Sequence, residues 1–170
     1  MNSDDFLRTV RETSMPTAWW MGQMGLFLKL GETLISIDYY ADPSPRRLTP
    51  VPVPAEKVRG VSLFLGSHIH DDHIDLPSWK IYLNTCPDAL FVVPRAVVPS
   101  LLSQGFPERR LIGMNHGETW TDDHGVTIRS VAASHEFLDR DPVTGLYPYL
   151  QYVIWSPGYV LAYIVIILLV

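Results

Sequence analysis

The sequence predicts an α/β fold with mixed β-sheets, and three features support this prediction. Short apolar or alternating runs separated by glycine fill residues 17–38, which is typical of a β-meander. Strand-like and helix-like segments then alternate over residues 61–105, which favours helices layered on sheets. The length of 170 residues suits one domain, because a chain of this size buries roughly 70% of its unfolded surface.

The amino-terminal elements are predicted from the spacing of apolar residues and the positions of glycine and proline. Residues 4–13 place Phe6, Leu7 and Val10 at helical spacing, so we expect an amphipathic helix that is a candidate for subunit contacts in a homo-oligomer. Strands are expected over residues 17–21, 25–30 and 33–38. The proline-rich segment 39–59 predicts an extended surface loop.

The later elements alternate between strand and helix. Residues 61–65 and 90–93 are apolar runs typical of buried strands, and helices are expected over residues 75–84 and within 94–105. A hairpin turn at residues 123–125 precedes a strand over residues 126–133. A polar loop is expected over residues 136–148.

The densest chemical motif lies in the loop after the strand 61–65. His68, His70, Asp72 and His73 fall within six positions, and imidazole and carboxylate are ligands of Zn, Mn or Fe. Because Asp72 and His73 are adjacent, we expect their side chains to diverge, so that two ions share the four residues. The alternative is a solvated acidic-histidine loop or an adventitious metal site.

This motif, His-x-His-x-Asp-His after an apolar strand, resembles the signature of the metallo-β-lactamase superfamily. The segments 19–25, 91–99, 133–141 and 145–149 resemble its L-ascorbate-6-phosphate lactonase branch, and the resemblance covers about residues 15–154. It implies a four-layer αββα sandwich, of which this chain holds the amino-terminal half.

The resemblance also implies roles for further residues. His135, at the end of the strand 126–133, completes the first ion's set with His68 and His70, the alternative being a core histidine. Asp38 and Asp75 orient the metal ligands without binding the metal themselves, although Asp38 could also be an ordinary aspartate that caps a turn at a strand end. Asp72 both binds metal and acts as the catalytic proton acceptor.

The implied cofactor is a pair of divalent ions, with manganese expected from the family and zinc or iron also compatible with the donors. The implied reaction is the opening of the lactone ring of L-ascorbate 6-phosphate to 3-keto-L-gulonate 6-phosphate by metal-activated hydroxide. Arg140 and Tyr147 are candidates for binding this phosphorylated sugar-acid lactone, although a salt-bridged structural loop would use the same residues.

The chain departs from the family pattern after Ile154. The family continues to a Gly-Asp-Thr segment, whose aspartate bridges the ions, and to a further histidine, and neither follows here. We therefore expect a partial hydrolase domain over residues 1–154, truncated or frame-shifted, and an atypical apolar tail over residues 155–170. Two rival functions remain open, namely a hydrolase of the same fold for another lactone or a phosphodiester, and an inactive remnant.

Composition and charge limit the classes of binding partner that we expect. The formal net charge of −5 offers no electrostatic surface for nucleic acid. The single cysteine, Cys86, fits a reducing compartment, and the acidic amino terminus lacks a signal sequence, so a cytoplasmic location is expected. The apolar run 159–170 is shorter than the roughly 20 residues of a spanning helix, so no membrane association is expected.

Overall fold

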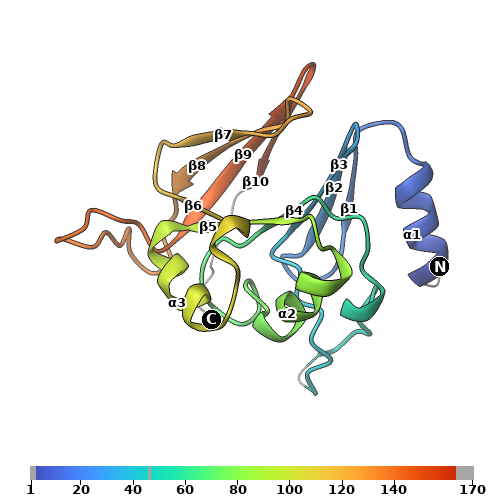
Figure 1. Cartoon of the computed structure of the whole chain (residues 1–170), viewed down its shortest axis with the longest axis horizontal. Coiled ribbons are helices and arrows are strands. Elements are labelled where there is room, and N and C mark those ends of the chain that lie inside the picture. The colour runs from blue at the N-terminus through green and yellow to red at the C-terminus, as the bar shows by residue number, and fades with distance from the viewer. Residues whose placement is uncertain (1–2, 46, 164–170) are drawn as a thin grey trace. The chain divides into compact units, whose positions relative to one another are not determined.

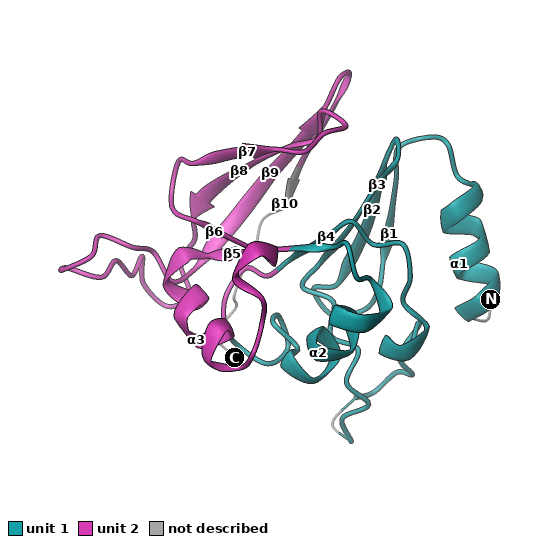
Figure 2. Ribbon diagram, in the orientation of Figure 1, with its two compact units in different colours: residues 1–65, 70–90 teal, residues 66–69, 91–170 magenta. Residues whose placement is uncertain are grey.

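The computed structural model describes residues 3–45 and 47–163 (Figure 1). The chain divides into two compact units, which Figure 2 shows in different colours. Unit 1 comprises residues 1–65 and 70–90, and unit 2 comprises residues 66–69 and 91–170. Each unit contains both helices and strands, which confirms the predicted α/β class. That residues 1–154 act as one hydrolase domain stays a prediction.

Unit 1 is built on a mixed set of four strands. The strands are β1 (Thr17–Trp20), β2 (Leu26–Leu30), β3 (Thr33–Ile37) and β4 (Leu63–Leu65). The first three pair antiparallel in sequence order, whereas β3 and β4 run parallel with Ile37 opposite Leu65. Both strand directions therefore occur together, as the sequence predicts.

Helices and aromatic rings bury the apolar sides of these strands. Helix α1 (Ser3–Glu12) places Phe6 against Trp19 and Phe27, with ring centroids 5.9 Å and 6.1 Å away. Helix α2 (Leu76–Thr85) stacks Tyr82 on Phe64 of β4 at 4.5 Å. These contacts fix the strand β4 from which the histidine loop departs.

The proline-rich segment 39–59 differs in part from its prediction. Val53 and Val58 are fully buried, and a short 3-10 helix, η1, spans Ala55–Lys57. The Tyr39 hydroxyl donates to the carbonyl of Val53 (2.7 Å) and accepts from its N–H (3.0 Å). The segment is thus an anchored connection rather than wholly a surface loop, because Val53 and Val58 reach the core.

Unit 2 contains the remaining elements and begins within β5 (Leu90–Pro94), from Phe91 onward. A 3-10 helix η2 (Arg95–Val97), helix α3 (Val98–Ser103) and a 3-10 helix η3 (Glu108–Arg110) lead to β6 (Leu111–Met114), which runs parallel to β5. An antiparallel sheet of order β10-β9-β8-β7 follows. Its strands are β7 (Thr119–Thr121), β8 (Thr127–Ala132), β9 (Leu150–Ser156) and β10 (Tyr159–Tyr163).

The segment predicted as an apolar tail begins inside this sheet. Strand β9 continues past Ile154 to Ser156, and β10 returns antiparallel with Val160 opposite Trp155. Residues 155–163 therefore extend the sheet, while residues 164–170 of the predicted tail lie outside the described residues. Within the described ranges, no helix has the length and apolar character needed to cross a membrane.

Candidate metal centre

His68 is held in a loop whose backbone is anchored to neighbouring strands. Gly66 N–H donates to the carbonyl of Val92 (3.0 Å), and Leu150 N–H donates to that of Ser67 (3.0 Å). The side chain of His68 is buried, and its Nδ1 lies 3.0 Å from Ser67 Oγ. A bond at Nδ1 directs metal ligation to the other ring nitrogen, Nε2.

His135 reaches His68 from the loop that follows β8. The two imidazole centroids are 5.6 Å apart, although the residues are distant in sequence. The ring of Tyr149 contacts both, with centroids 5.3 Å from His68 and 5.0 Å from His135. The backbone also joins the segment before His135 to Tyr149, because Ala133 N–H donates to the carbonyl of Tyr149 (3.0 Å).

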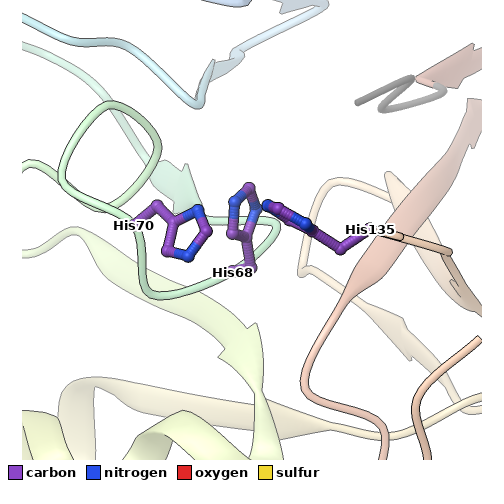
Figure 3. A group of neighbouring side chains, drawn as sticks. All are labelled: His68, His70 and His135. Carbon is purple, nitrogen blue, oxygen red and sulfur yellow. The ribbon is translucent and has the colours of Figure 1, made fainter. Parts of the chain in front are cut away.

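His70 completes a group of three histidines (Figure 3). One ligand nitrogen from each of His68, His70 and His135 lies within 4.8 Å of the other two, and Figure 3 shows the ring of His68 between the other two rings. Nitrogen ligands bind zinc at about 2.0–2.1 Å, so the three nitrogens would move closer together to enclose one ion. Three imidazoles fit a divalent transition metal.

The burial of the three rings differs. His68 is buried, His135 is half-buried and His70 is exposed. A catalytic metal requires protein ligands on one side and access for water and substrate on the other. The gradient in burial matches that requirement.

Asp72 and His73 form a second pair, in which the side chains approach each other. Asp72 Oδ2 lies 3.9 Å from His73 Nε2. The prediction that these neighbours diverge is wrong, because the backbone turns here and His73 N–H donates to the carbonyl of His70 (2.9 Å). Their role as ligands of a second ion stays a prediction.

Asp38 lies behind this pair. Its Oδ2 is 2.8 Å from His73 Nδ1, and both side chains are buried. This contact fixes the imidazole orientation with Nε2 toward Asp72, which is the geometry expected of a residue that supports a metal ligand.

Asp75 bonds to backbone rather than to a ligand. Its Oδ2 accepts from the N–H groups of Ala41 and Asp42 (2.9 Å each), and its Oδ1 accepts from Ser78 N–H (3.2 Å) at the start of α2. Asp75 thus caps the helix and ties it to the segment that follows β3. Any support that it gives to the ligands is indirect.

Arg140 and Tyr147, the predicted substrate residues, contact each other. The guanidinium of Arg140 lies 5.8 Å from the ring centroid of Tyr147, and its Nε–H donates to the carbonyl of Gly145 (3.3 Å). Tyr147 N–H donates to Asn115 Oδ1 (3.0 Å). These contacts hold both residues within the loop, and binding of substrate by them stays a prediction.

The other histidines lie in different settings. His116 Nδ1 accepts from Ala132 N–H (3.0 Å), and His124 is in the exposed turn between β7 and β8.

Sequence reasoning missed three residues beside the predicted ligands, namely Ser67, Tyr149 and Gln23. The side-chain Nε2–H of Gln23 donates to Asp72 Oδ2 (3.1 Å). The only signal for Gln23 and Tyr149 is their place in segments that carry the family resemblance.

Comparison with known proteins gives a distant sequence relationship. The chain is 23% identical over 128 residues to the probable L-ascorbate-6-phosphate lactonase UlaG of Shigella dysenteriae, a match that covers 59% of this chain. The match spans about a third, 36%, of the length of that relative. No family model matches the chain.

Comparison with solved structures shows the fold. A possible metal-dependent hydrolase from Veillonella parvula superposes with a TM-score of 0.67 at 17% identity, over 88% of this chain and 63% of that one. The metallo-beta-lactamase fold protein YhfI from Bacillus subtilis superposes with a TM-score of 0.53 at 14% identity, over 81% of this chain and 52% of that one.

Proposed function

Because this chain has the metallo-β-lactamase fold, we propose that it acts as a metal-dependent hydrolase that opens the lactone ring of L-ascorbate 6-phosphate. The observation that carries the proposal is the convergence of His68, His70 and His135. The distant relationship to a probable L-ascorbate-6-phosphate lactonase supplies the substrate. Manganese is the proposed ion, and zinc and iron suit the same donors.

In the proposed reaction, the three histidines bind the metal and Asp72 transfers a proton. A divalent ion held by the three histidines would supply Lewis acidity toward the lactone carbonyl and activate water at neutral pH. Asp72, whose side chain is 45% exposed, would accept the proton of the attacking water. It would return that proton to the ring oxygen as the C–O bond breaks, so that the carboxylate is regenerated.

Hydrolysis of L-ascorbate 6-phosphate by the purified chain with Mn²⁺ tests this proposal. We expect turnover by the native chain and a loss of about 100-fold or more in a His68→Ala, His70→Ala double variant, because both changes remove metal ligands. His124→Ala is the matched control, since this histidine lies in an exposed turn. A folded native chain without turnover, or a double variant with full turnover, would contradict the proposal.

A substrate panel tests the substrate separately. Turnover of a homoserine lactone or a phosphodiester, with none of L-ascorbate 6-phosphate, would retain the metal-dependent hydrolase and reject the proposed substrate.

A further inference from the structure

Gln23 lies in a tight turn between β1 and β2. Met21 N–H donates to the carbonyl of Gly25 (2.8 Å), and Gly25 N–H donates to that of Gly22 (2.8 Å). The indole Nε1–H of Trp20 donates to the carbonyl of Gln23 itself (2.8 Å). These bonds fix the backbone on both sides of Gln23.

The turn also packs tightly on the segment that follows β3. A Cβ atom on Gly25 would lie 3.1 Å from Cδ2 of Tyr39 and 3.2 Å from its Cα. Tyr39 is anchored in turn by its two hydrogen bonds to Val53. The position of the turn is therefore set relative to Asp38, the residue before Tyr39.

Gln23 and Asp38 share an uncommon backbone conformation. Their φ angles are 51° and 43°, and they are the non-glycine residues with positive φ among those that the structure describes. Left-handed backbone at such residues costs free energy and is concentrated at functional sites. Both side chains reach the same adjacent pair, since Gln23 donates to Asp72 and Asp38 contacts His73.

We propose that Gln23 is a positioning residue that holds the Asp72 carboxylate in place to bind a divalent cation together with His73. This proposal rests on the proposed metal-dependent function. A lysine or arginine at this position would neutralise the carboxylate, whereas the neutral amide holds Oδ2 and preserves the negative charge that attracts a cation. The geometry agrees, because the oxygen that accepts from Gln23 also lies 3.9 Å from His73 Nε2.

Two variants distinguish the effect of losing the Gln23 side-chain amide from the effect of straining the backbone of the turn. Gln23→Gly removes the amide and accepts the left-handed conformation, whereas Gln23→Ala removes the amide and strains the turn. The measurement is Mn²⁺ titration of the full chain by calorimetry, with the melting temperature recorded for each variant. The tighter class of sites is assigned by its loss in His68→Ala.

We expect both variants to weaken the second, weaker class of Mn²⁺ sites by about tenfold, with the tighter class unchanged. Gln23→Gly should melt at or above the native temperature and Gln23→Ala below it. Native Mn²⁺ affinity in Gln23→Gly would overturn the proposal, since it would restrict Gln23 to a role in the turn. A native chain with one class of sites, lost in His68→Ala, would also overturn it and leave the three-histidine proposal standing.

Discussion

His73 lies between two acidic side chains that come from different parts of the chain. Asp38, which follows β3, contacts Nδ1 at 2.8 Å, and Asp72 Oδ2 is 3.9 Å from Nε2. A carboxylate on one nitrogen of a metal-ligating imidazole fixes its orientation and raises its basicity. The contribution of His73 to metal binding should therefore depend on the negative charge of Asp38.

Replacement of Asp38 by asparagine tests this dependence. Asparagine tolerates the left-handed backbone and nearly preserves the shape, so the fold should persist. We expect the affinity of the weaker Mn²⁺ class to fall about 10- to 100-fold, because the imidazole loses its charged partner. Calorimetric titration measures the affinity, and an unchanged value would show that Asp38 serves only the packing.

Tyr149 presents a different residue-level test, because its ring contacts both His68 and His135. Tyr149→Ala should lower the affinity of the tighter Mn²⁺ class by about tenfold, since two imidazoles lose the surface that orients them. Tyr149→Phe retains the ring and should bind Mn²⁺ like the native chain. Equal affinities in all three proteins would contradict the assigned packing role.

At the scale of elements, α2 and the segment after β3 are joined through one carboxylate. Asp75 accepts from Ala41, Asp42 and Ser78, and its side chain is buried. Its removal would leave two N–H groups of the anchored segment and one at the helix start without their acceptor. The same carboxylate follows the histidine loop directly, so it connects the site to the fold.

We expect Asp75→Ala to lower the free energy of unfolding by about 2–4 kcal/mol, as buried donors lose their partner and α2 loses its cap. Urea denaturation measures this change. Asp122→Ala is the control, because Asp122 accepts comparable backbone bonds in an exposed hairpin turn and should cost about 1 kcal/mol. A cost for Asp75→Ala no larger than that of the control would contradict the anchoring role.

The buried Tyr39 predicts a specific alkaline response. Burial raises the pKa of its hydroxyl from 10.0 to about 12. The stability that this neutral hydroxyl contributes is fully present below pH 10 and is lost as the pH rises from 10 to about 12, because the unfolded chain ionises first. Urea unfolding across this window should show a decline that is smaller in Tyr39→Phe, and equal slopes would contradict the assignment.

The elements also show what sequence can predict. Apolar runs next to glycines predicted β3 and β4, and an alternating run predicted β8 and placed His135 after the end of that strand. The partners of the histidines could not be predicted, because Gln23 and Asp72 are 49 residues apart and meet only through tertiary packing. The approach of Asp72 to His73 was not predicted for a local reason, since adjacency suggested divergent side chains whereas the backbone turns at residues 70–73.

At the scale of the whole molecule, two loops that are distant in sequence carry the candidate site. Strand β9 joins them, because its first residue, Leu150, donates to Ser67 while the neighbouring Tyr149 accepts from Ala133. The backbone of unit 2 thus brings His68 and His135 together. The central claim is that this arrangement makes a metal site.

The most direct test is the number of Mn²⁺ ions retained per chain after equilibrium dialysis, measured by mass spectrometry of the metal. We predict one tightly held ion in the native chain and in His124→Ala, and an affinity at least about tenfold lower in His135→Ala, which loses one of three ligands. Native Mn²⁺ binding by His135→Ala, or no tight binding by the folded native chain, would contradict the account.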